Sequence, residues 1–157
     1  MKITLLVIGK TEEPWLREAL AEYAGRVKRY TAFELTEVPA VRDTRSMPEP
    51  EQKRREAALL GKHIGEHDLV VLLDEHGKET RSVQFAAFLN RLFSTGRKNL
   101  VFVAGGPYGF DESLRNRADH LLSLSKMTFS HQMVRVVFLE QLYRALTILR
   151  NESYHHE

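Results

Sequence analysis

Short apolar runs alternate along this chain with segments in which apolar residues recur at helical spacing. The run Ile3–Ile8 predicts a first strand, and Phe33–Val38 alternates apolar and polar residues as a partly exposed strand does. The uninterrupted runs Leu69–Leu73 and Leu100–Ala104 are typical of strands that are buried on both faces of a sheet. A shorter run, Leu121–Leu124, predicts a last strand.

The segments between these runs predict helices. Pro14 suits a first helical turn, and a charged segment with two prolines leads into a second helix that ends near His63. Gly77 is expected to turn the chain after the third strand. The later helices are expected to begin at polar residues, namely Ser82, Asp111 and either Ser130 or His131.

Strands that alternate with helices predict an α/β fold, in which a mostly parallel sheet is covered by helices on both faces. At 157 residues the chain has the length of one domain. No internal repeat, low-complexity segment or long linker divides it. We therefore expect residues 1–157 to form a single domain.

The last predicted helix, which ends near Arg150, is apolar over an unusually wide arc. At 100° per residue its apolar side chains span roughly 200°, about twice what a helix packed on a sheet needs. The arc is formed by Val134, Val137, Phe138, Leu139, Leu142, Ala145, Leu146, Ile148 and Leu149. Because large apolar patches seldom stay exposed, this surface predicts a second copy of the chain as its cover, and hence a homodimer.

The charges of the chain are nearly balanced, with a formal net charge of +2 at pH 7. So small an excess attracts nucleic acid weakly, so any RNA contact has to come from local patches or a second subunit. The absence of cysteine excludes disulfides and thiolate metal sites and agrees with a reducing compartment. With no bilayer-spanning run and no signal-peptide pattern at the N-terminus, we expect a cytoplasmic protein without a membrane or DNA partner.

A glycine-rich segment, Gly105-Gly106-Pro107-Tyr108-Gly109, directly follows the buried strand Leu100–Ala104. Open parallel sheets bind ligands at the carboxyl ends of their strands, and glycine lets a ligand approach the backbone. The spacing fits neither the dinucleotide-binding fingerprint nor a P-loop. A turn without any ligand explains this segment equally well.

The segment Leu124–Phe129 is a second candidate binding loop, between the last strand and the last helix. Its backbone amides and carbonyls are able to hydrogen-bond an adenine edge, while Met127 and Phe129 supply apolar walls. The spacing also fits a simpler interpretation, in which these two side chains belong to the core.

The titratable residues show no familiar catalytic or metal-binding pattern. Seven histidines occur without zinc-like spacing to acidic partners, so no metal site is expected. His131 lies at a helix start, where the helix dipole disfavours its charged form. Glu140 and Arg144 are one turn apart and predict an ion pair on the helix surface. Near the C-terminus, Tyr154-His155 either belongs to a solvated tail or folds back over a pocket.

Taken in order, these segments resemble the motifs of one family, the ribosomal RNA large-subunit methyltransferase H group of the SPOUT class of knotted methyltransferases. The opening Met1–Lys10 and the segments Glu22-Tyr23 and Glu37-Val38-Pro39 also fit, so the resemblance covers essentially the whole chain. Its main motifs are Gly105–Gly109, Leu122–Phe129, His131–Val137, Glu140–Ala145 and Tyr154-His155. Two departures are Ser130, where this family often has proline, and Asn151–Ser153, where a glycine is more usual.

The resemblance implies an enzyme that methylates N3 of a pseudouridine in large-subunit ribosomal RNA with S-adenosyl-L-methionine. It further implies a homodimer and a C-terminal trefoil knot, one of the rare exceptions to unknotted topology. By match of motif, the substrate side would contain Arg135, Tyr154 and His155. The cofactor pocket would contain Leu73, Gly105, Leu124, Ser125, Lys126, Met127, Thr128 and Phe129. Because the net charge is small, we expect an assembled ribosome to be the substrate.

The implied reaction needs the anion of a uracil-type ring, because N3 is a poor nucleophile while protonated. Arg135, or donors from Tyr154 and His155, would stabilise charge on the ring carbonyls. Alternatively, His155 would accept the N3 proton. We favour electrostatic stabilisation over a dedicated base.

Two other functions stay open at this point. One is a non-catalytic module that binds RNA or the ribosome with the same fold. The other is a nucleotide-binding hydrolase, which the lack of a P-loop, a nucleophile elbow and a metal set disfavours.

Overall fold

The computed structural model describes the whole chain, residues 1–157, as one parallel sheet with helices on both faces. The strands are β1 (Lys2–Ile8), β2 (Phe33–Val38), β3 (Leu69–Glu79), β4 (Asn99–Ala104) and β5 (His120–Ser123). The helices are α1 (Pro14–Val27), α2 (Glu49–Gly61), α3 (Ser82–Phe93), α4 (Glu112–Arg117) and α5 (Met133–Leu149). The strand order is β2-β1-β4-β3-β5, and every neighbouring pair is parallel. The predicted α/β class is thereby confirmed, while the knot stays a prediction.

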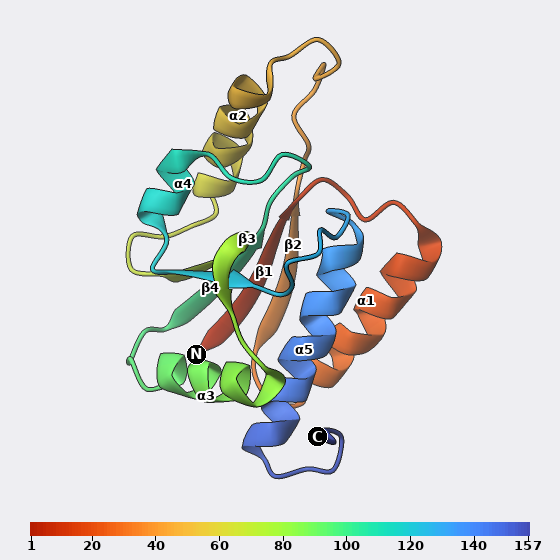
Figure 1. Cartoon of the computed structure of the whole chain (residues 1–157), viewed down its shortest axis with the longest axis vertical. Helices are drawn as coiled ribbons and strands as arrows, with labels where there is room; N and C mark the ends of the chain where they lie inside the picture. The colour runs from red at the N-terminus through yellow and green to blue at the C-terminus, as the bar shows by residue number, and fades with distance from the viewer.

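Each face of the sheet has its own apolar core, because side chains alternate between the two faces along a strand. Helices α1, α3 and α5 cover one face and pack on alternate strand residues such as Leu5 and Phe102. Helices α2 and α4 cover the other face, where Leu6 and Val103 are buried (Figure 1). No helix of the chain is both long and apolar enough to cross a membrane.

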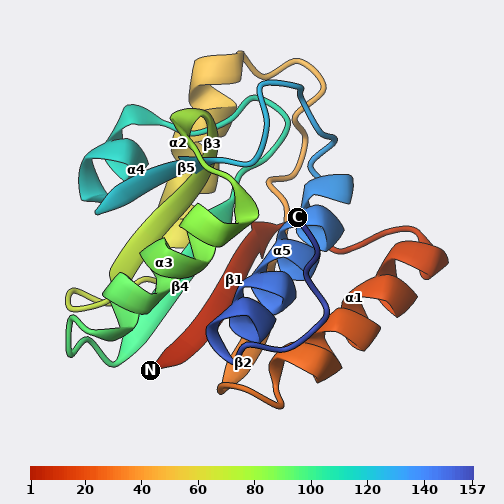
Figure 2. The ribbon, with the colours of Figure 1, turned by 60° about the horizontal axis from the view of Figure 1, so that its bottom comes forward.

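Helix α5 lies between α1 and α3 over the sheet, as both ribbon views show (Figures 1 and 2). This position explains much of its wide apolar arc, because three neighbouring elements of the same chain cover it. Phe138, Leu139, Leu142, Ala145 and Leu146 are buried, whereas Val134, Val137, Ile148 and Leu149 stay half-buried. The arc therefore requires less cover from a second copy than the sequence pattern indicated.

Strand β3 continues past its apolar run, which contradicts the predicted turn at Gly77. After Leu73 the pairing register with β5 shifts, so that Leu73 and Lys78 both face Leu122. A Cβ at Gly77 would stand 2.6 Å from the backbone of Leu121. Glycine is needed here for close passage over β5 and not for a turn, since strand geometry resumes at Lys78.

The predicted helix starts are correct in two cases and shifted in two. Pro14 begins α1, and the Asp111 side chain accepts a hydrogen bond from the Ser113 amide at the start of α4. Ser82 is the first residue of α3 and not its cap, because Gln84 Oε1 accepts from the Arg81 amide at 2.9 Å. Helix α5 begins only at Met133, where the Ser130 hydroxyl accepts from the Met133 amide at 3.0 Å.

Candidate functional site

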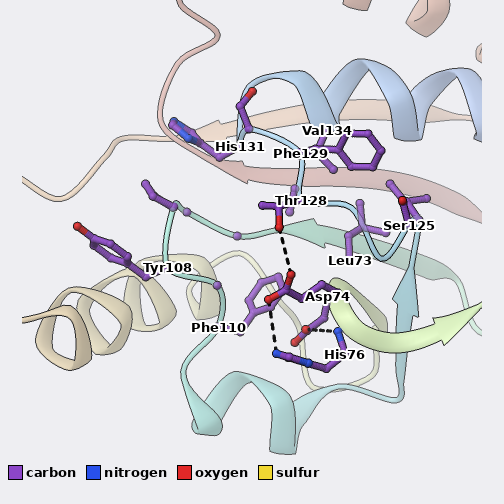
Figure 3. A pocket seen from close by; sticks show the side chains of 18 of the residues that line it. Leu73, Asp74, His76, Tyr108, Phe110, Ser125, Thr128, Phe129, His131 and Val134 are labelled. Carbon is purple, nitrogen blue, oxygen red and sulfur yellow. Dashed lines mark hydrogen bonds and ion pairs between the residues drawn. The ribbon is translucent and has the colours of Figure 1, made fainter.

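A cavity of about 490 Å³ lies where β4 and β5 end and where the pairing of β3 with β5 is interrupted after Leu73 (Figure 3). Because the strands are parallel, their carboxyl ends meet at this edge, the usual place for a ligand in an open α/β sheet. Its walls come from residues 73–76 of β3, residues 104–110 at the end of β4 and beyond it, and the loop between β5 and α5. Arg115 of α4 and Val134 of α5 complete the lining.

Most residues predicted for the cofactor pocket line this cavity. They are Leu73, Gly105, Leu124, Ser125, Met127, Thr128 and Phe129, whereas Lys126 is exposed and does not line it. Met127 is 79% exposed, so the alternative that it is a core residue is wrong. In Figure 3, Ser125 lies at one end of the cavity and Tyr108 and His131 lie at the other.

The loop between β5 and α5 keeps several backbone amides free. Ser125 shapes its first half, since its carbonyl accepts from Ser123 Oγ at 3.0 Å and its hydroxyl accepts from the Met127 amide at 2.9 Å. The amides of Lys126, Thr128 and Phe129 make no hydrogen bond within the chain. Unpaired amides beside a cavity are positioned to bind acceptor atoms of a ligand.

Acidic residues that sequence reasoning missed form one wall of the cavity. The buried Asp74 accepts from Arg115 Nε and from the His76 amide, each at 2.9 Å. Glu75 accepts from Thr128 Oγ1 at 3.4 Å, which joins this wall to the opposite loop. The available signal was the position of Asp74, directly after the apolar run Leu69–Leu73 of a buried parallel strand, where ligand-facing side chains collect.

The glycine loop rests on a second buried carboxylate, Glu56 of α2, which is only 4% exposed. Glu56 Oε1 accepts from Gln52 Nε2 at 3.1 Å, while Oε2 has no partner. Burial raises the pKa of this carboxyl above its usual 4.5. A Cβ at Gly106 would stand 2.6 Å from both carboxylate oxygens, so only glycine fits beside Glu56 without displacing it.

Arg135 does not reach the cavity, which contradicts its expected place on the substrate side. Its guanidinium is 1% exposed and donates to the Ile8 carbonyl at 2.6 Å and to Thr11 Oγ1 at 2.9 Å. It also donates to the His131 carbonyl at 3.1 Å and pairs with Glu37 at 3.4 Å. These bonds tie the start of α5 to the end of β1, so we revise the role of Arg135 to positioning.

His131 lines the cavity at the turn before α5. Its pKa lies below the usual 6.5, mainly because the ring is partly buried and secondarily because Arg135 is near. The expected neutral form is thereby supported, although the causes are burial and a neighbouring cation and not the helix dipole. His131 is thus a neutral imidazole that faces the cavity near neutral pH.

The C-terminal tail folds back along α5, away from the cavity of its own chain (Figure 2). Tyr154 donates to Glu140 Oε1 at 3.0 Å, and His155 Nδ1 lies 3.3 Å from Arg144 Nη1. The predicted Glu140–Arg144 ion pair is present at 2.5 Å. Burial, with hydrogen bonds to Tyr23 and Glu140, raises the pKa of Tyr154. Within a single chain the tail therefore lies on α5 and not over the cavity, and the expected role of Tyr154 and His155 on the substrate side stays a prediction.

Comparison with known proteins gives a consistent result across the chain. A family model described as "Predicted SPOUT methyltransferase" matches residues 1–155. The chain is 50% identical to "Ribosomal RNA large subunit methyltransferase H" of Parabacteroides distasonis and 48% identical to that of Bacteroides thetaiotaomicron, each over 100% of both chains. The protein of the same name from Geobacter sulfurreducens is 46% identical over 99% of this chain and 100% of its own length.

Solved structures support the fold at much lower sequence identity. A probable methyltransferase from Bordetella pertussis Tohama I is 14% identical, with a TM-score of 0.54 over 92% of this chain and 94% of that one. The overall fold is thus shared with that structure. Together with the full-length relatives, this shows that the chain belongs to the SPOUT methyltransferase family, among the ribosomal RNA large-subunit methyltransferases H.

Proposed function

We propose that this chain transfers a methyl group from S-adenosyl-L-methionine to N3 of a pseudouridine in large-subunit ribosomal RNA, within the assembled ribosome. The observation that carries the proposal is the cavity at the strand ends, where a glycine loop faces a loop with free amides. Relatives of the same length, named ribosomal RNA methyltransferases, support the class of substrate.

The cavity fits S-adenosyl-L-methionine in size and in chemistry. Its volume of about 490 Å³ lies within the range of small-molecule sites. The free amides of Thr128 and Phe129 suit the acceptor nitrogens of an adenine, and Leu73 and Leu124 provide apolar walls. Gly105 lets the ligand approach the backbone. When bound, this cofactor supplies a methyl group activated by a sulfonium.

Charge in the cavity also suits this cofactor, which carries a sulfonium and an ammonium cation. Asp74 is already paired with Arg115, whereas the Glu75 carboxylate is exposed on the wall, lies 3.5 Å from His76 Nε2 and accepts a long hydrogen bond from Thr128. We assign Glu75 to the cationic part of the cofactor and the loop Leu124–Phe129 to its adenine. Lys126 belongs to this loop through its free amide and not through its side chain.

The proton of N3 has to leave as the methyl group arrives. Neutral His131 faces the cavity and is able to accept a proton, directly or through water. Tyr154 and His155 remain candidates for the substrate side only if a second copy of the chain brings its tail to this cavity. Half-buried apolar residues of α5 and the exposed Trp15 of α1 offer such a copy a surface, which supports the homodimer.

The experiment that tests the proposal is transfer of labelled methyl from S-adenosyl-L-methionine to purified ribosomes, followed by mapping of the modified base. We expect label at N3 of one pseudouridine and little label on a naked hairpin of the same sequence. Label at another base or atom would reject the substrate assignment. A lack of cofactor affinity in calorimetry would favour the alternative, a non-catalytic module that binds RNA.

A further inference from the structure

A second cavity, of about 320 Å³, lies between α3 and the edge strand β5 and shares no residue with the first. It is lined by Lys78 of β3 and Thr80 just beyond it, by Phe88 and Arg91 of α3, and by His120 and Leu122 of β5. The register shift after Leu73 creates both sites. Residues 74–76 turn toward the first cavity, and Lys78 then pairs with β5 and enters the second.

The rim of this second cavity carries cations without acidic partners. Lys78 and Arg91 are exposed, and neither forms an ion pair or a side-chain hydrogen bond within the chain. Other exposed cations such as Arg29 and Lys62 also lack partners, but they line neither cavity, whereas Lys78 and Arg91 meet around one hollow. Unpaired cations around a hollow favour an anionic ligand.

The floor of the cavity is aromatic and apolar. The ring of Phe88 meets His120 edge to face at 5.1 Å, and the Arg91 guanidinium lies 5.7 Å from the Phe88 ring centre. Planar aromatic and guanidinium groups are the surfaces on which unpaired bases stack. One nucleotide supplies both groups that this cavity suits. Its phosphate pairs with Lys78 and Arg91, and its planar base stacks on Phe88 and His120.

We propose that this cavity binds an unpaired nucleotide of the RNA substrate, a few nucleotides away from the one that is methylated. The inference rests on the proposed function, because it assumes an RNA substrate. Strand β5 starts at His120 in this cavity and leads directly into the loop Leu124–Phe129 of the first one. At about 3.3 Å per residue, four residues of strand separate the two sites by roughly 13 Å, a span that a few nucleotides bridge.

This second site also explains how a weakly charged protein selects RNA. The target base has to reach the cofactor in the first cavity, and the second cavity holds the backbone and a nearby base, so orientation comes from two local contacts and not from net charge. The occupant is RNA and not an acidic protein segment, because a carboxylate would use the cations but leave the Phe88–His120 surface without a partner.

The test compares the double variant Lys78→Gln/Arg91→Gln with the wild-type chain on ribosomes. Removing two phosphate contacts should raise the KM for ribosomes by about tenfold or more, since each is a charged hydrogen bond. The dependence of log KM on log salt should become shallower by about 1.4, the value for two phosphates of a single strand. Affinity for S-adenosyl-L-methionine and the melting temperature should not change.

A matched control removes the same charge elsewhere. Arg29 and Lys62 are exposed, lie outside both cavities and form no ion pair, so Arg29→Gln/Lys62→Gln should leave KM unchanged. Phe88→Leu keeps the apolar volume but removes the stacking ring. It should weaken binding of a short fluorescent oligouridylate at least fivefold, as the lower bound for one stacked base indicates.

Each outcome decides between the hypotheses. An unchanged KM for Lys78→Gln/Arg91→Gln, with normal methylation by the wild type, would overturn this inference and leave the proposed function intact. If Lys78→Gln/Arg91→Gln raises the KM for ribosomes but the variants bind oligouridylate as tightly as the wild type, the cavity contacts a ribosomal protein. This result would also overturn the inference. Failure of the wild type to methylate ribosomes would reject the proposed function itself, whereas oligouridylate binding would still measure the second cavity.

Discussion

Glu56 lies against Gly106 so closely that a Cβ atom on this glycine would stand 2.6 Å from both carboxylate oxygens. The contact joins α2 to the loop that lines the cavity at the strand ends. A buried carboxyl on a helix thus sets the path of a backbone segment expected to approach the cofactor.

Replacing Gly106 by alanine should displace Glu56 and shift the loop. Overpacking of this kind costs about 1–3 kcal/mol of stability, and we expect the affinity for S-adenosyl-L-methionine in calorimetry to fall with it. Gly25→Ala is the matched control, because a Cβ there meets nothing within 4 Å. Glu56→Ala/Gly106→Ala should lose less than the sum of the two single variants, since truncation of Glu56 frees the space. Strict additivity would show that the two residues do not interact.

Replacing Glu56 by glutamine should flatten the dependence of stability on pH. Burial raises the pKa of Glu56 in the folded chain above 4.5, so the folded state holds this proton more tightly than the unfolded state. The protonated Glu56 carboxyl therefore contributes to the free energy of unfolding of the wild type below pH 4.5. This contribution is lost as the pH rises through the pKa of Glu56 in the folded state. Urea unfolding should find Glu56→Gln more stable than the wild type at neutral pH and similar to it in acid, with the exposed loop residue Glu66→Gln as control.

The sequence pattern predicted the strands and the glycine loop of this site, but not the buried residues that support the loop. The uninterrupted run at Leu69–Leu73 and the glycines after Ala104 place a cavity at the strand ends, because both signals are local. The support from Glu56 was not predictable, since it depends on where α2 packs after a long loop. The continuation of β3 was missed because it depends on a close approach at Gly77, which leaves no apolar pattern.

Arg135 shows a different limit of sequence reasoning. A cation on the last helix fits both a substrate contact and a buried anchor, and its spacing among apolar residues does not distinguish them. The deciding partners, Ile8 and Thr11, lie at the far end of the chain and meet Arg135 only in the folded structure.

Replacing Arg135 by methionine should therefore damage the fold before it damages chemistry. The Ile8 carbonyl and Thr11 hydroxyl would lose their donor, and breaking a buried charged cluster costs about 3–5 kcal/mol. Thermal melting should show this loss, with Arg150→Met, an exposed arginine beyond the same helix, as control. Native stability combined with lost turnover would instead return Arg135 to a direct catalytic role.

The tail residues Tyr154 and His155 should act on the cavity of a second copy of the chain or not at all. Tyr154→Phe/His155→Ala would remove the tail groups, and Thr128→Trp would fill the cavity from an exposed loop position. If tail and cavity work across a dimer, unfolding and refolding the two inactive variants together should restore about a quarter of wild-type activity, because half of the dimers then hold one intact site. Light scattering should report a dimer for each variant, and an inactive mixture of dimers would contradict action across subunits.

The pH dependence of methyl transfer should report on His131. Burial and the nearby Arg135 cation keep its pKa below 6.5, so the imidazole is neutral at pH 7 and able to accept the N3 proton. We expect kcat on ribosomes to be level near neutral pH and to fall only as the pH drops below 6.5.

His131→Gln keeps a polar side chain at the cavity but should lower kcat by about 10²–10⁴ and remove this acid limb. The affinity of His131→Gln for the cofactor distinguishes a proton acceptor from a residue that only positions the cofactor. A positioning role would weaken cofactor binding and leave the shape of the pH profile unchanged. An acid limb that survives the substitution would exclude His131 as the acceptor and favour stabilisation of the ring anion by donors alone.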